Sequence, residues 1–336
     1  MTLASIPSPS ISTFEIGPLT IHLYALCILA GIIAAVAITT ARWKKVGGDF
    51  DQILDIAIVS VLAGIVGARV YHIVTTPERF FGPDGDPMEM IRIWNGGLGI
   101  WGGILFGALA AWGWCRHKHY PMALLADAVA PALLVAQAIG RLGNWFNQEL
   151  YGGQTTLPWG LQIDGSDALY HPTFLYELIW NLIGAALIIW IGRRAAAMLK
   201  AGSLLTIYVM WYTAGRTWIE ALRIDYAHTF LGVRINVWVS IAVFICGVIA
   251  FIAVQRVGSA PEPLRERLAA VTASEQAEQG ERTRHPASDE ASDASESAEP
   301  EPSEPSESSE SLAETEHSEV PRLKVSAKLW LVPHQK

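Results

Sequence analysis

The chain has 336 residues, of which 51% are hydrophobic and 17% are charged. Soluble domains carry charge on about a quarter of their residues, so this composition excludes an ordinary soluble domain. The net charge of −8 has a local origin, because the residues from Val257 onward hold 8 Lys/Arg and 17 Asp/Glu, whereas the preceding residues hold 16 and 15. The acidity therefore belongs to the C-terminal segment and indicates nothing about the partners of the preceding residues. No nucleic-acid partner is expected.

Seven apolar stretches are candidate membrane spans, since a helix needs about 20 residues to cross the hydrocarbon layer. The third stretch is short and rich in glycine, and the sixth carries charged residues. No soluble fold accommodates so many apolar stretches so closely spaced. The sequence therefore predicts an all-α integral membrane protein with seven transmembrane helices, at residues 21–40, 51–74, 98–115, 122–142, 173–193, 203–223 and 235–255.

Lysine and arginine gather in alternate loops, and this asymmetry predicts the orientation, because cytoplasmic loops carry the excess of these residues. The loops after the first, third and fifth spans are basic, whereas residues 145–172 contain no Lys or Arg. The N-terminus is therefore predicted to lie outside and the C-terminus in the cytoplasm. The basic residues of the cytoplasmic loops are Arg42, Lys44, Lys45, Arg116, Lys118, Arg193, Arg194 and Lys200.

Residues 257–336 are rich in Ser, Glu, Pro and Ala, and contain no Phe, Trp or Tyr before Trp330. Such a segment cannot bury enough apolar surface to offset the entropy that it would lose on ordering. We therefore predict two parts. A seven-helix transmembrane domain covers residues 1–256, and a disordered acidic tail in the cytoplasm covers residues 257–336.

Five ionisable side chains fall inside the predicted spans, where such residues are costly and usually functional. With the predicted orientation, all five lie in the outer halves of their helices. Other polar residues gather near this depth in the first span and in the outer loops, among them Tyr24 and His171. A wet, polar cavity open toward the outer leaflet explains this common depth. The five ionisable residues are Arg69, Arg141, Glu177, Arg216 and Glu220.

Three charged residues of the sixth span share one helical face. Arg216, Glu220 and Arg223 follow the spacing i, i+4, i+7. An ion-paired stripe that only fixes helix packing is one interpretation. Two arginines against one glutamate leave positive charge over, however, and this surplus favours an anionic ligand.

Residues 95–103 contain a formal G-x-G-x-x-G pattern. No predicted strand precedes it, and it leads into a span, so a dinucleotide site is not indicated. Gly99, Gly103 and Gly107 instead repeat every four residues, which is typical of closely packed membrane helices. No cofactor is expected. The three cysteines have no paired spacing, and there is no H-E-x-x-H motif, so no metal site is expected either.

Residues 140–153 read Gly-Arg-Leu-Gly-Asn-Trp-Phe-Asn-Gln-Glu-Leu-Tyr-Gly-Gly at the outer end of the fourth span. This stretch resembles the signature of the prolipoprotein diacylglyceryl transferase family, G-R-x-G-N-[FW]-x-N-x-E-x-x-G. Further matches follow the family order: Tyr24, the stretch 171–177, and the stretch 215–223. The resemblance covers about residues 10–255 and leaves the tail outside.

The resemblance implies a reaction in the bacterial cytoplasmic membrane, with the active site toward the outer leaflet. The diacylglyceryl group of phosphatidylglycerol, a membrane lipid, passes to the lipobox cysteine of a prolipoprotein signal peptide. A thioether forms and glycerol phosphate is released, which is the first step of lipoprotein maturation. Guanidinium groups suit this chemistry, because they bind a phosphodiester bidentately in a water-poor site.

By family position, Arg141 and Arg216 are expected to bind the phosphate. The catalytic candidates are these two arginines with Glu149 and His171. The wider set of expected phosphatidylglycerol-binding residues is Tyr24, Arg69, Trp101, Arg141, Asn144, Asn147, Gly152, Arg216, Glu220 and Arg223.

One position departs from the family pattern. The family usually has His-Gly-Gly at the start of the third span, and this histidine has been proposed as a base. Here the triplet is Trp101-Gly102-Gly103. An indole nitrogen cannot accept a proton, so the identity of any base stays open.

Other classes of membrane protein fit less well. A retinal-binding photoreceptor needs a lysine in its last span, and residues 235–255 contain none. A membrane protease would need a serine dyad or a metal motif. A polytopic transporter of an anionic substrate remains the alternative, although it would favour an internal repeat with interrupted helices, and the sequence shows no repeat.

Overall fold

The computed structural model describes residues 5–17, 19–81, 85–93 and 96–261, together with 266, 269–270 and 273–274. The chain divides into two units, Met1–Glu281 and Arg282–Lys336, and the description that follows concerns the first. Almost all of the predicted tail lies outside the described residues, so its disorder and its boundary at residue 257 stay predictions.

Within the described ranges, seven helices have 18 residues or more, and each overlaps one predicted span. Five of them are long and apolar enough to cross a membrane: α1, α2, α5, α6 and α8. The other two, α4 and α7, match the stretches with glycines or charges. A mostly helical membrane protein is thus confirmed. The seven helices are α1 Leu23–Trp43, α2 Phe50–Thr75, α4 Ile100–His117, α5 Met122–Phe146, α6 Thr173–Arg194, α7 Ser203–Leu222 and α8 Ile235–Val257.

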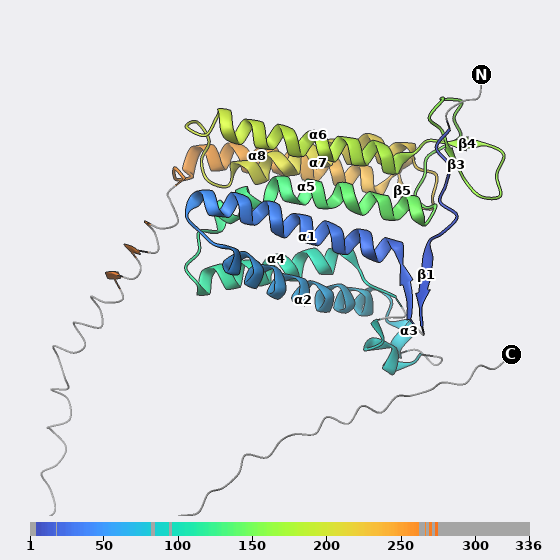
Figure 1. The fold of residues 1–336 in the computed structure, drawn as a ribbon, viewed down its shortest axis with the longest axis horizontal. Coiled ribbons are helices and arrows are strands. Elements are labelled where there is room, and N and C mark those ends of the chain that lie inside the picture. The colour runs from blue at the N-terminus through green and yellow to red at the C-terminus, as the bar shows by residue number, and fades with distance from the viewer. Residues whose placement is uncertain are drawn as a thin grey trace, which may run out of the picture. The chain divides into compact units, whose positions relative to one another are not determined.

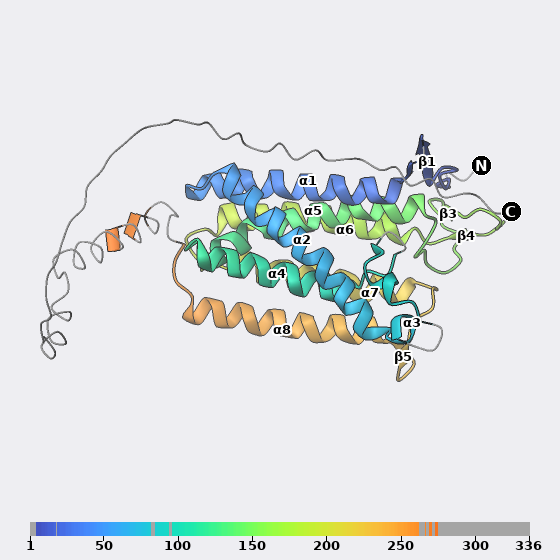
Figure 2. The ribbon, with the colours of Figure 1, turned by 90° about the horizontal axis from the view of Figure 1, so that it is seen from below.

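The seven helices run side by side in a bundle (Figure 1). Helix α5 lies inside it and contacts α1, α6 and α7, whereas α2 packs on α4 and α7 packs on α8. In Figure 2, α1 and α8 lie at opposite edges of the bundle. These two edge helices leave many large apolar side chains exposed, including Ile33 of α1 and Ile249 of α8. Such surfaces are unfavourable in water and suit contact with lipid chains.

Glycines let α2 and α4 approach closely. A Cβ atom on Gly103 would lie 3.5 Å from the carbonyl oxygen of Gly64, and one on Gly107 would lie 3.2 Å from that of Ser60. The predicted stripe of small residues on α4 is therefore confirmed as a helix-packing surface.

A pair of tryptophans joins α6 to α7. The rings of Trp180 and Trp211 are stacked, with their centroids 4.4 Å apart. Each indole N–H donates to the backbone carbonyl of the other residue at 3.0 Å. Gly184 and Gly215 make room for the rings, since a Cβ atom on either glycine would overlap an indole.

Three two-stranded antiparallel hairpins and the short helix α3, Glu78–Phe81, gather at one end of the bundle, here called the hairpin end (Figure 1). Helices α1, α6 and α8 begin at this end, and α5 and α7 finish there. The short 3₁₀ helix η1, Lys44–Val46, lies at the opposite end, and η2 covers Pro87–Met90. The hairpins are β1 Thr13–Ile16 with β2 Leu19–His22, β3 Leu161–Gln162 with β4 Leu169–Tyr170, and β5 Thr229–Phe230 with β6 Val233–Arg234.

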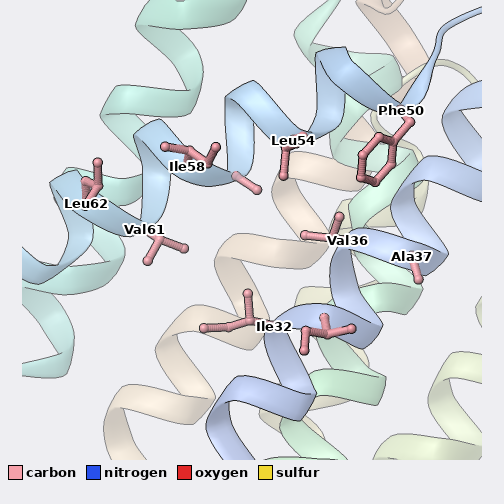
Figure 3. Close-up of a pocket in the computed structure, with 10 residues that line it drawn as sticks. Ile32, Val36, Ala37, Phe50, Leu54, Ile58, Val61 and Leu62 are labelled. Carbon is pink, nitrogen blue, oxygen red and sulfur yellow. The ribbon is translucent and has the colours of Figure 1, made fainter.

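An apolar groove of about 520 Å³ lies between α1 and α2. Figure 3 shows side chains of both helices, such as Ile32 and Val36 of α1 and Leu54 of α2, facing this groove. Its lining holds hydrocarbon side chains alone, so it offers no group for acid–base or nucleophilic chemistry. The chemistry must lie elsewhere.

Candidate active site

A cluster of charged side chains lies at the hairpin end, where α5, α6 and α7 meet. Glu177, in the second turn of α6, is only 3% exposed. Its Oε1 lies 2.6 Å from Nη2 of Arg141 on α5, and its Oε2 lies 3.3 Å from Nη1 of Arg216 on α7. One buried carboxylate thus holds two guanidinium groups side by side. Neither arginine reaches this position without the packing of three helices.

Glu220 forms a second centre of the cluster one turn farther along α7. Its side chain is fully buried and pairs with Arg216, with Arg223 at 3.2 Å and with Arg234 at 3.0 Å. Asn236 also donates to it at 3.0 Å. The predicted shared face of the sixth span is therefore confirmed. Glu220 itself is enclosed by arginines, so it orients them and has no free edge for a ligand.

Asp225 completes the cluster just after α7. It pairs with Arg223 at 2.7 Å and with Arg234 at 3.0 Å. Burial acts to raise the pKa of Asp225, but the hydrogen bonds and charges of these two arginines outweigh it and lower the pKa below its ordinary value. Among the described residues, four arginines thus share ion pairs with three carboxylates, Glu177, Glu220 and Asp225. Within these ion pairs the arginines outnumber the carboxylates by one, although Asp225 offsets part of the surplus predicted for Arg216 and Arg223 against Glu220.

The turn after α5 links Arg141 to Glu149. Arg141 donates from Nη1 to Oδ1 of Asn144 at 3.1 Å, and Nδ2 of Asn144 donates to Oε1 of Glu149 at 2.8 Å. Asn147 donates to the same oxygen at 3.3 Å. The backbone at Gln148 has a positive φ of 51°, which turns the chain sharply and brings Glu149 back over the helix end.

Gly152 holds three segments together at the edge of the cluster. It forms an antiparallel bridge with Arg223, and its N–H donates to the carbonyl of His171 at 2.9 Å. A Cβ atom here would lie 2.8 Å from that of His171 and 2.9 Å from the carbonyl oxygen of Leu222. Only glycine allows this approach.

The family model described as prolipoprotein diacylglyceryl transferase matches residues 12–253. The chain belongs to this family. It is 68% identical to the phosphatidylglycerol--prolipoprotein diacylglyceryl transferase of Bifidobacterium adolescentis over 82% of this chain and 87% of the relative. It is 56% identical to the enzyme of that name from Bifidobacterium longum, over 82% and 93%, and 50% identical to the one from Cutibacterium acnes, over 75% and 87%.

The residues that match the diacylglyceryl transferase signature therefore contact one another in the folded chain. Tyr24 of α1 adjoins it, because a Cβ atom on Gly143 would lie 2.8 Å from the Tyr24 ring. His171 is near as well, but its Nδ1 lies 3.1 Å from the hydroxyl of Tyr176, and none of the contacts described for the ring involves an arginine.

Two predicted residues lie apart from the arginine cluster. Trp101 is 54% exposed in the first turn of α4 and has no hydrogen bond to any described residue. Arg69 is buried on α2 and donates to four backbone carbonyls: to Met90 at 2.9 Å, to Gly96 at 2.7 Å, to Gly97 at 2.9 Å and to Glu89. The guanidinium of Arg69 therefore holds residues 89–90 and 96–97 against α2. The structure does not bring it to the expected phosphate-binding arginines.

Four residues of the cluster were missing from the predicted site: Glu177, Asp225, Arg234 and Asn236. Glu177 carried a signal, since it is a charged residue inside a span and belongs to a matched stretch. The other three lie beyond the sixth span, and their roles depend on how the β5–β6 hairpin folds back onto α7.

A small cavity lies within this cluster of the diacylglyceryl transferase. Its volume is about 10 Å³, which holds roughly one water molecule. The described residues contain no group of three or more His, Cys, Asp or Glu that could hold a metal ion. The chemistry available here is electrostatic, from guanidinium groups held by buried carboxylates. The cavity is lined by Arg141, Asn144, Leu150, Thr173, Phe174, Glu177 and Arg223.

Proposed function

We propose that this chain is a transferase that moves the diacylglyceryl group of phosphatidylglycerol to the lipobox cysteine of prolipoproteins, the first step of lipoprotein maturation. The observation that carries the proposal is the meeting of Arg141 and Arg216 on one buried carboxylate, next to the signature residues Asn144 and Glu149. The names of the close relatives support the same substrates.

The reaction breaks one bond and forms another. The cysteine thiolate attacks the glycerol carbon of the diacylglyceryl group that bears the phosphate. A C–S bond forms as the C–O bond breaks, and glycerol phosphate leaves with the electron pair. Arg141 and Arg216 bind the phosphate oxygens and neutralise the charge that collects on them. Glu177 keeps the two guanidinium groups at the spacing that this requires.

The thiol proton is the remaining requirement. A free thiol with a pKa near 8.5 gives a few per cent of thiolate at pH 7, and nearby arginines increase that share. The site therefore works without a base at Trp101. Glu149 and His171 are the alternative proton acceptors, because both adjoin the signature turn.

The proposed topology has all seven long helices spanning the bacterial cytoplasmic membrane, with the N-terminus outside and the hairpin end toward the outer leaflet. The lipid can then enter from the bilayer and the signal peptide from the same side. The basic residues at the opposite end support this orientation. Residues 1–256 form the catalytic domain, and residues 257–336 form a cytoplasmic tail.

The transporter alternative finds no support in the helices. Each of the seven long helices runs without a break, whereas a transporter typically has interrupted helices around its substrate.

One assay tests the proposed function. Purified protein is incubated with phosphatidylglycerol and a lipobox peptide, and mass spectrometry detects the gain of a diacylglyceryl group on cysteine. Arg141→Ala should lower the rate by more than about 100-fold, which corresponds to ~2.7 kcal/mol of barrier. Arg194→Ala, at the opposite end of the bundle, is the control and should transfer at the parental rate. A parental rate in Arg141→Ala would exclude Arg141 as a phosphate ligand, and absence of any product from the parent would exclude the function.

A further inference from the structure

A second pocket, lined by both charged and apolar side chains, lies at the end of the bundle opposite the arginine cluster. It has a volume of about 250 Å³ and lies between the end of α1, the start of α5, the end of α6 and the start of α7. Among its lining residues, Asp127 is the one carboxylate. Four cationic side chains line the same pocket: Arg42, Lys45, Arg193 and Lys200.

The carboxylate of Asp127 is already bonded to the backbone of α7. Its two oxygens accept hydrogen bonds from the N–H groups of Gly202 and Leu204, each at 2.8 Å. These are donors that a helix start leaves without partners inside the helix. Arg42 donates to the backbone carbonyl of Asp127 at 3.0 Å instead of to the carboxylate. Asp127 therefore fixes the start of α7 and does not form a close ion pair with the cations.

The four cations remain available to a ligand. None of them takes part in an ion pair within the described part of the chain. The Nε–H of Arg42 is buried and has no acceptor among the described residues, which is unfavourable unless a ligand oxygen reaches it. Leu124 and Leu204 give the pocket an apolar wall as well. An anion with a hydrocarbon part matches this combination.

We propose that this pocket binds the phosphate of an anionic phospholipid in the leaflet opposite the active site. Basic pockets between membrane helices on the cytoplasmic side are suited to phosphate headgroups. The pocket volume accommodates a phosphate with its glycerol, and the acyl chains can leave along the exposed apolar surface of the helices. This site is separate from the transferase site and takes no part in the bond-forming step.

The chain offers matched variants for the test, because η1 and the last turn of α6 each have one cation that lines the pocket and a neighbour that does not. The pocket pair is Lys45→Gln with Arg193→Gln. The control pair is Lys44→Gln with Arg194→Gln, which removes the same charge from the same two helices. All four side chains are exposed, so both pairs should fold. The full-length protein in detergent is titrated with short-chain phosphatidic acid, with phosphatidylcholine and with inorganic phosphate, and native mass spectrometry counts the bound molecules.

We expect the parent to bind phosphatidic acid at one site beyond the transferase site. The pocket pair should bind there about 30-fold more weakly, at ~1 kcal/mol for each charge removed, and the control pair within about threefold of the parent. Both pairs should keep the parental transfer rate. Loss of lipid binding at this pocket can therefore be distinguished from loss of transferase activity. Equal binding by the two pairs would overturn the proposal, and so would inorganic phosphate binding as tightly as the lipid. Occupation of the pocket by the acidic residues after Pro261 would likewise give equal lipid binding by the two pairs, and would therefore overturn the proposal.

Discussion

Glu177 is the residue on which the geometry of the site depends most directly. Among the described residues, its carboxylate is the one that forms ion pairs with both Arg141 and Arg216. Without it, two guanidinium groups would face each other in a buried site. Removing one partner of a buried ion pair costs about 3–5 kcal/mol, largely because the remaining charge is left unpaired.

Glu177→Gln should therefore lower kcat by at least about tenfold, since the amide keeps the shape of the side chain but no longer holds both cations (tenfold is ~1.4 kcal/mol of barrier). The loss should appear in kcat more than in KM, because the arginines remain present but are no longer positioned for the leaving phosphate. Glu15→Gln, on the exposed strand β1, is the control. An unchanged kcat in Glu177→Gln would show that the arginines position themselves.

Trp101 takes the place where the family usually has a histidine, and its exposure suits packing against lipid. We predict that Trp101→Phe keeps most of the transfer activity.

The transfer rate should rise toward the thiol pKa, with no inflection near pH 6–7, if the thiolate forms without a base. The pH–rate profiles of the parent and of His171→Gln provide the measurement. An inflection in the parent that disappears in His171→Gln would identify His171 as the base.

At the scale of helices, the tryptophan pair fixes α6 against α7 and so fixes Glu177 against Arg216. Gly215 lies one residue before Arg216, and its missing side chain is what admits the Trp180 ring. The position of Arg216, the proposed phosphate ligand, thus depends on a packing contact next to it in the helix.

Gly215→Ala should destabilise the protein by about 1–3 kcal/mol, because an added methyl group overlaps the Trp180 indole and forces the helices apart. The matched control is Gly113→Ala in α4, where nothing lies within 4 Å of the new Cβ. That change should be neutral or slightly stabilising, since alanine favours a helix over glycine by about 1 kcal/mol. Thermal unfolding in detergent compares the two variants. Equal Tm values for the two variants would show that the tryptophan pair does not stabilise the contact between α6 and α7.

The sequence was sufficient to predict the long helices, because hydropathy is a local property and each apolar stretch coincides with one helix. It also predicted the shared face of Arg216, Glu220 and Arg223, which follows from helical spacing alone. The bridge made by Glu177 could not be derived in this way, since it depends on the packing of three helices. The role of Arg69 was missed for a related reason: its acceptors are backbone carbonyls of residues 89–90 and 96–97, whose position beside α2 no local pattern indicates.

For the whole molecule, the orientation in the membrane decides which substrates can reach the site. We predict that residue 150 faces the outside and residue 300 the cytoplasm. Single-cysteine variants at these positions, in a background without Cys27, Cys115 and Cys246, can be labelled in intact cells with a membrane-impermeant thiol reagent. Labelling at 150 and not at 300 is expected. The reverse pattern would place the arginine cluster on the cytoplasmic side and overturn the topology.

The cavity beside Arg141 and Glu177 has room for about one water molecule, far less than a phosphoglycerol headgroup needs. If the lipid phosphate binds between Arg141 and Glu177, the hairpin end must open to admit it. We then expect the opening rate to set the upper limit of turnover at high phosphatidylglycerol content. Since the helices lie in the bilayer, we expect this limit to respond to lateral pressure and to temperature, and not to substrate concentration alone.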